Sequence, residues 1–161
     1  MKTLISTALI GIALVATTAP IALAEDENNV TSGYTLAGAP LGLHGSDPVA
    51  LIETGIRLDG SAEFAHVHEG VAYYFNTRAN LRTFRRNPDA YIPAYGGFCA
   101  LGVALGKKLD GDPRFSAVRD GQLYVFVNEE ILRNFLNDEA GTLARAERNW
   151  TEIEHTAASD L

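Results

Sequence analysis

Phe115–Val127 reads FSAVRDGQLYVFV, and this stretch decides the fold. Two segments rich in β-branched and aromatic residues, Phe115–Val118 and Leu123–Val127, flank the pair Asp120-Gly121. An Asp-Gly pair between two such segments is a strong short-range signal of a β-hairpin, because both turn residues must adopt positive φ. The stretch therefore predicts two antiparallel strands joined by a tight turn.

Helices are expected directly after this hairpin. Asn128 is a favourable N-cap residue, and the helix that it opens carries Ile131, Leu132 and Phe135 at helical spacing. We expect this helix to run to about Asn137. A last helix is expected over Thr142–Trp150.

The first half of the chain adds further elements. Val71–Phe75 is β-branched and aromatic and predicts a central strand, and Thr77–Arg86 predicts a capped helix that Pro88 stops. Ser61–His68 is expected to be a short helix opened by its serine, and Val49–Ile52 a short strand. Together the elements predict an α+β fold, with short helices packed on a small antiparallel sheet. We find no internal repeat in the sequence.

The N-terminus has the pattern of a cleavable signal peptide. Lys2 is the only charge before Glu25, and the mostly apolar run Leu4–Ala16 follows it. Small residues then occupy the −3 and −1 positions in Ala22-Leu23-Ala24. The run is too short to span a membrane, which needs ~20 apolar residues. We therefore expect cleavage after Ala24 and a periplasmic or secreted protein, with residues 1–24 as the signal.

The remaining chain is expected to form one domain. We assign residues 25–32 to a disordered lead-in, 33–150 to the domain and 151–161 to a flexible tail. The chain has 13 Lys and Arg against 20 Asp and Glu, a net charge of −7. Such acidity argues against a nucleic-acid partner and against an anionic membrane surface. The sequence does not indicate an oligomeric state.

Cys99 is the only cysteine and the first candidate for chemistry. It follows Gly96-Gly97, where the backbone can bend freely and a partner could approach closely. Lys107 and Lys108 would lower the pKa of the thiol if the fold returned them to it. Three interpretations stay open for Cys99: a buried small apolar residue, a metal ligand, or a redox-active thiol.

Histidines are the second group of candidates. His44 precedes the turn at Asp47, and His66 and His68 would share one face of a strand but not of a helix. Cys99 with His44 and one of His66 or His68 would suit a copper or zinc ion by ligand type. The more common role for each histidine is that of a surface residue or a satisfied structural residue.

The chain resembles the YHS domain family over roughly Gly33–Trp150. The resemblance is carried by an Asp-Pro-Val opening, an aromatic strand, and a Phe, a Pro and a Tyr at fixed spacing, here Asp47-Pro48-Val49, Tyr73-Tyr74-Phe75, Phe84, Pro88 and Tyr91. Gly96–Pro113 is similar to the C-terminal extension of exported bacterial members. The resemblance implies a YHS-like domain with such an extension.

The chain also departs from that family pattern. Where the YHS modules of heavy-metal pumps carry cysteines, this sequence has Ala50, Asn76 and Asn80. The thiolates that select a soft metal are therefore missing at those positions. Ser46, Leu51 and Ile52 stand where exported members carry aromatic residues.

Three functions follow as hypotheses. The first is a non-enzymatic protein that binds a transition metal, most plausibly copper, through Cys99 and nearby histidines. The second is a thiol oxidoreductase in which Cys99 is the single redox centre and an external thiol completes the cycle. The third is a structural or interaction module in which Cys99 only packs.

Overall fold

The structure, a computed structural model, describes residues 26–161, and the signal peptide expected at 1–24 lies outside the described residues. The first half contains the helix α1 (Pro48–Thr54), the strands β1 (Ser61–His68) and β2 (Val71–Phe75), and the helix α2 (Arg78–Arg86). β1 and β2 pair antiparallel, and the turn residues Glu69 and Gly70 both have positive φ.

The second half repeats this order with one additional helix. Its elements are α3 (Ala100–Ala104), β3 (Asp112–Arg119), β4 (Gln122–Phe126), α4 (Glu129–Asn137) and α5 (Glu139–Ile153). The predicted hairpin at Asp120-Gly121 and the predicted α+β class are confirmed. Within residues 26–161, however, the strands pair as two two-stranded sheets, whereas one small sheet was predicted.

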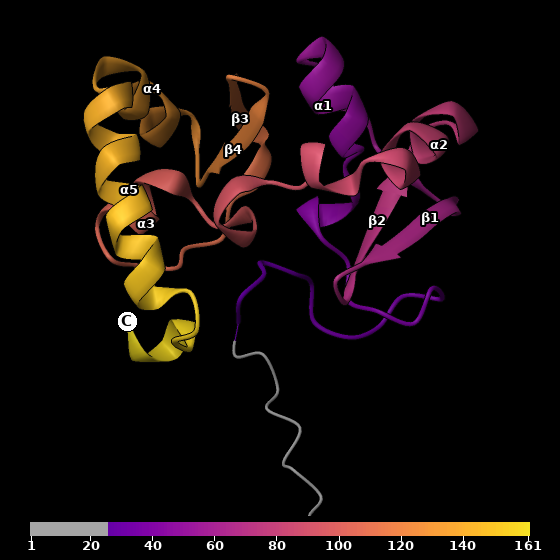
Figure 1. The fold of residues 1–161 in the computed structure, drawn as a ribbon, viewed down its shortest axis with the longest axis horizontal. Helices are drawn as coiled ribbons and strands as arrows, with labels where there is room; N and C mark the ends of the chain where they lie inside the picture. Colours follow the sequence, from indigo (N-terminus) through magenta and orange to yellow (C-terminus); the bar gives the residue numbers. More distant parts are fainter. Residues whose placement is uncertain (1–25) are drawn as a thin grey trace, which may run out of the picture.

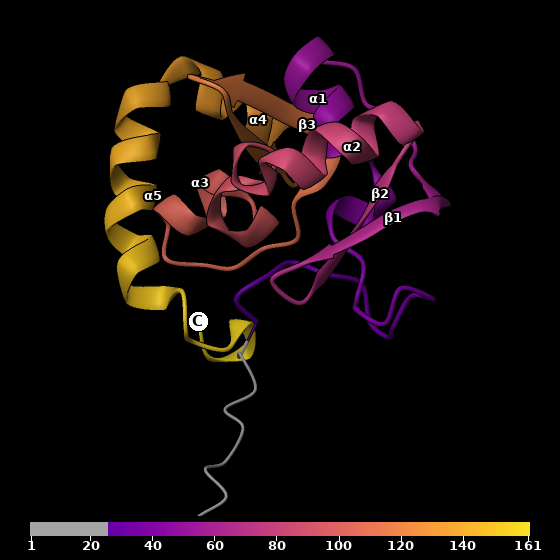
Figure 2. The same ribbon diagram turned by 45° about the vertical axis from the view of Figure 1, so that its right-hand side comes forward.

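Figure 1 shows the two halves as neighbouring lobes. One lobe holds α1, α2, β1 and β2, and the other holds β3, β4 and the helices α3, α4 and α5. In Figure 2, α5 runs along the outer side of the second lobe and α3 lies beside it.

The two lobes meet at β4. Leu123 and Val125 belong to the apolar core of the first lobe, whereas Phe126 belongs to the core of the second. Because successive strand residues face opposite sides, one strand contributes to both cores.

The two lobes share one order and arrangement of elements, and we treat them as two structural repeats, although no repeat was found in the sequence. We call 41–87 the first repeat and 93–138 the second repeat. Isolated parallel bridges join Leu41 to Ala72 and Pro93 to Leu123 at equivalent places. Both hairpins shift register at the same point, between Ser61 and Ala65 in one and between Asp112 and Ser116 in the other. Both hairpins lead into a helix capped by a side chain, that of Thr77 or Asn128.

The repeat also relates Asp47 to Cys99. Each precedes the first helix of its unit, and each backbone N–H donates to a carbonyl across a loop: Asp47 to Leu58 and Cys99 to Leu109, both at 2.9 Å. A run of positive φ precedes both positions, at Leu43–Gly45 and Tyr95–Gly97. Asp47 and Cys99, which the sequence analysis interpreted separately, therefore occupy equivalent positions in the fold.

Two predicted elements were wrong. Val49–Ile52 is not a strand but part of α1, because the Asp47 carboxylate accepts hydrogen bonds from Val49 N and Ala50 N and Pro48 occupies the first turn. Ser61–His68 is not a helix but the strand β1, because it pairs with Val71–Phe75 across a tight turn. The predicted helices after Thr77 and Asn128 are confirmed, and the last helix is longer than predicted.

Both ends of the described chain make defined contacts. In the segment expected as a disordered lead-in, Asn29 donates through its side chain to Gly97 O at 3.0 Å and to Asp110 Oδ1 at 2.8 Å. Lys108 is buried and donates to the carbonyls of Asp26, Glu154 and Thr156 at 2.7–2.9 Å. The lead-in and the segment expected as a flexible tail are therefore joined through one ammonium group. Within residues 26–161 no helix is long and apolar enough to cross a membrane.

Candidate functional site: the cleft between the two repeats

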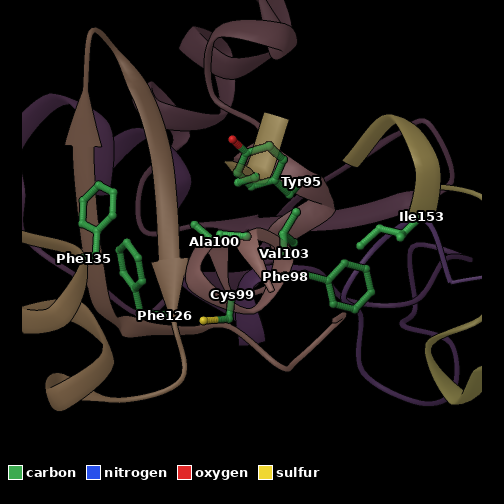
Figure 3. Packing of buried hydrophobic residues seen from close by; sticks show 10 residues of the cluster. Tyr95, Phe98, Cys99, Ala100, Val103, Phe126, Phe135 and Ile153 are labelled. Atoms are coloured by element: carbon green, nitrogen blue, oxygen red, sulfur yellow. The ribbon is translucent and has the colours of Figure 1, made fainter. Parts of the chain in front are cut away.

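Cys99 lies in the apolar core of the second lobe. Its exposed fraction is 0%, and it packs in a cluster with Phe98, Phe126 and Phe135. Figure 3 shows its sulfur directed toward the hairpin that carries Phe126. The thiol therefore has no access to solvent or to an external thiol in this conformation.

Neither downstream lysine is placed to activate the thiol. Lys107 is exposed. The ammonium of Lys108 is held by three backbone carbonyls and lies over the rings of Phe98 and Trp150, 5.4 and 5.6 Å from the two centroids. Burial lowers the pKa of Lys108, against the opposing effect of nearby acidic groups. Its role in the structure is to join the two ends of the described chain.

The three candidate histidines occupy different surroundings. His44 lies at the surface, where its Nε2 is 2.8 Å from Asp110 Oδ1. His66 and His68 do share a face, because β1 is a strand, and both rings pack edge-on against Phe84 at 6.0 and 6.1 Å. Burial, followed by Arg85 and His68, lowers the pKa of His66. His66 and His68 therefore pack within the first lobe, whereas His44 contacts Asp110 of the second repeat.

The described residues do not assemble the expected metal site. No group of three or more His, Cys, Asp or Glu residues that could hold a metal ion occurs within 26–161.

The positions at which the family resemblance places cysteines do lie together, around Asp47. The Asp47 carboxylate accepts hydrogen bonds from Ala50 N at 3.1 Å, Asn76 N at 2.8 Å and Asn80 Nδ2 at 2.7 Å. Copper or zinc binding by Cys99 with His44, His66 or His68 stays a prediction from the sequence.

A cleft lies where the two repeats, the lead-in and the end of α5 meet. Its volume is about 250 Å³. The first repeat contributes the end of β1 and the start of β2, and the second contributes the turn that precedes α3. The residues that bear on its chemistry are Glu27, His68, Glu69, Tyr73, Tyr95 and Trp150.

Two tyrosines that are buried as residues line the cleft, and their hydroxyls have no hydrogen-bond partner among residues 26–161. Tyr73 is 4% exposed and Tyr95 is 8% exposed, and both line the cleft. Neither hydroxyl forms a hydrogen bond with another residue of 26–161. Every side-chain polar atom of this part of the chain that is fully enclosed does have a hydrogen-bond partner. The hydroxyls therefore reach open space, which the cleft supplies. Burial raises the pKa of both phenols, with smaller contributions from Glu69 for Tyr73 and from Tyr124 and Glu147 for Tyr95. Both are protonated at neutral pH and can donate a hydrogen bond.

The charged groups lining the cleft are acidic. Glu27, Glu69 and Glu154 line it, and no Lys or Arg of the described chain does. Glu27 is paired with His155 at 2.6 Å, and Glu154 lies near both His155 and Lys108. Glu69 has no ion-pair partner among residues 26–161. One carboxylate at the cleft is thus left without a compensating cation in the described chain.

The lead-in forms one wall of the cleft because Gly96 lets it approach closely. Its φ is +59°, and a Cβ at this position would lie 2.0 Å from the carbonyl oxygen of Glu27. Only glycine permits this approach. The sequence correctly indicated close contact at Gly96-Gly97, but the contacting partner is the chain's own segment at residues 27–29.

A second hollow of about 480 Å³ adjoins the cleft and shares Glu27, Asn28, Glu69 and Val71 with it. It is lined mainly by apolar groups, including Val30, Pro40 and Val67. It has no side chain comparable to Tyr73 or Tyr95, with a buried ring and an unpaired hydroxyl. We therefore place the candidate site in the first cleft.

The sequence did not identify this site. Tyr73 was predicted within a strand and Trp150 at the end of a helix, and Tyr95 was not among the candidate residues. The available signal was the concentration of tyrosines at 91–95 beside two glycines. No family model, curated protein or solved structure matches this chain with significance.

Proposed function

We propose that this protein is a non-enzymatic binding protein whose ligand is a small polar molecule held in the cleft between the two repeats. The observation that carries the proposal is the pair of hydroxyls of Tyr73 and Tyr95, set on buried rings and left without partners in the described chain. Ligand sites combine apolar walls with a few fixed polar groups, and two hydroxyls on firmly packed rings at an open cleft provide such groups.

Binding without catalysis is favoured by the residues at the site. Both phenols have raised pKa values and are poor bases or nucleophiles at neutral pH. The ring nitrogen Nε2 of His68 is engaged with Asp89 Oδ1 at 3.1 Å. The only thiol, that of Cys99, lies in the core and does not line the cleft. The groups that do line the cleft are suited to donating hydrogen bonds and presenting aromatic rings.

The test is a fragment screen against the ¹⁵N-labelled mature protein, with fragments no larger than the cleft. We expect bound fragments to shift the amide signals of residues 68–73 and 92–96 and to lose affinity in Tyr73→Phe. The matched control is Tyr74→Phe on the same strand, because Tyr74 does not line the cleft. The proposal is wrong if no fragment shifts these signals, or if every fragment that does so binds Tyr73→Phe and Tyr95→Phe as tightly as the unmodified protein.

A further inference from the structure

The cleft combines aromatic rings with an uncompensated negative charge. Tyr95 and Trp150 lie 5.8 Å apart between ring centroids, and Tyr73 lines the same space from the first repeat. Glu69 stands at the turn of the first hairpin, also at the cleft, and is exposed. Aromatic faces attract cations through their quadrupoles, and a neighbouring carboxylate adds to this attraction.

We infer that the ligand of the cleft is a small organic cation, such as an amine or a quaternary ammonium compound, with its charge among Tyr73, Tyr95 and Trp150 and near Glu69. This inference rests on the proposed function and adds the chemical class of the ligand. An anion is disfavoured, because Glu69 lines the cleft without an ion-pair partner among residues 26–161 and no Lys or Arg of the described chain lines it. The tyrosine hydroxyls would bind a hydroxyl or carbonyl group of the same ligand.

The protein already places one ammonium group against these aromatic rings. Lys108 lies over one of them, with its Nζ 5.6 Å from the Trp150 ring centroid. Its remaining bonds go to the carbonyls of Asp26, Glu154 and Thr156, so this internal cation fastens the walls behind the cleft. The carboxylates of Asp26, Glu27 and Glu154 act on Lys108 and offset its charge, which reduces its repulsion of a second cation at the Trp150 ring that lines the cleft.

Three probes of nearly equal shape test the charge. Choline is a cation, 3,3-dimethylbutan-1-ol is its neutral counterpart, and 3,3-dimethylbutanoate is an anion. Trp150 is the only tryptophan in the chain, so its fluorescence reports binding at the cleft directly. We expect choline to bind about tenfold more tightly than the alcohol, the range that a cation–π contact supplies, and the anion to bind most weakly.

The variant Glu69→Gln separates charge from shape. We expect it to weaken choline binding severalfold and to leave the alcohol unchanged, whereas Glu63→Gln, exposed on the same hairpin but outside the cleft, alters neither. Equal binding of choline and the alcohol, or no binding of choline in a cleft that accepts neutral fragments, overturns the inference and leaves the proposed function standing. If no fragment binds the cleft, the proposed function fails as well.

Discussion

Replacing Asp47 with alanine is expected to be among the most destabilising single changes in the first repeat. Asp47 has an exposed fraction of 0%, and its carboxylate accepts four hydrogen bonds, from Val49 N, Ala50 N, Asn76 N and Asn80 Nδ2 at 2.7–3.1 Å. It therefore caps α1 and at the same time joins that helix to the end of β2 and to α2.

The magnitude follows from the donors that lose their acceptor. Loss of an N-cap costs about 1 kcal/mol, and each buried donor left without a partner costs about 1–3 kcal/mol. Val49 and Ala50 are buried, whereas Asn76 is exposed and water can replace part of the loss there. We therefore expect Asp47→Ala to reduce the free energy of unfolding by about 3–5 kcal/mol.

The assay is urea unfolding followed by circular dichroism, with Asn128→Ala as the matched control. Asn128 caps α4 at the surface through a single bond to Ile131 N of 2.9 Å, so its loss should cost about 1 kcal/mol. If Asp47→Ala proves no more costly than Asn128→Ala, Asp47 is an ordinary cap and our account of how the first repeat is held together is wrong.

Three further predictions concern groups outside Asp47. Cys99 should resist alkylation in the folded protein and react only after unfolding, since its exposed fraction is 0%; labelling at the rate of a free thiol would contradict the described core. Lys108→Met should accelerate amide hydrogen exchange at residues 26–31 and 154–156, because three carbonyls lose their common donor, while Lys107→Met at the exposed neighbouring position should not. Tyrosine absorbance near 295 nm should rise less near pH 10 in the folded protein than in urea, because burial raises the pKa of Tyr73 and Tyr95. Because the pKa of these phenols in the folded protein lies above the unfolded value of about 10, their contribution to the stability of the fold is complete below pH 10 and is lost as the pH rises further. Coincident titration curves of the folded and the urea-unfolded protein would refute this prediction.

Elements specified by local signals were predictable from the sequence. Asp120-Gly121 demands positive φ and lies between two β-prone segments, and Asn128 offers a cap before a periodic apolar stripe, so both elements were found. α1 was missed although its start signal was present. The Asp-Pro pair at Asp47-Pro48 was interpreted as a turn, but it is also a cap followed by proline in the first turn of a helix.

Elements that depend on distant partners were not predictable in this way. β1 has a break in register between Ser61 and Ala65, which disrupts the alternation that identifies a strand, and its pairing with β2 determines its conformation. The repeat was detectable in principle, because Phe75 and Phe84 recur as Phe126 and Phe135 at the same spacing. Few other identities accompany them, and apolar residues at such positions are common in unrelated sequences.

The candidate site was unpredictable because its walls come from four separate parts of the chain. Tyr73, Tyr95 and Trp150 belong to the first repeat, the second repeat and α5, and the lead-in closes one side at Gly96. Only the packing of the lobes brings these groups together. Cys99 drew attention as the only cysteine, but its equivalence to Asp47 in the repeat shows that this position belongs to the interior of the unit.

The most direct test of the central claim is a measurement of intermolecular nuclear Overhauser effects between the methyl protons of bound choline and the protein. We predict contacts to the ring protons of Tyr73, Tyr95 and Trp150, which together surround the cleft. Contacts confined to residues of the neighbouring apolar hollow, such as Tyr34 and Val67, would place the ligand elsewhere and contradict the account.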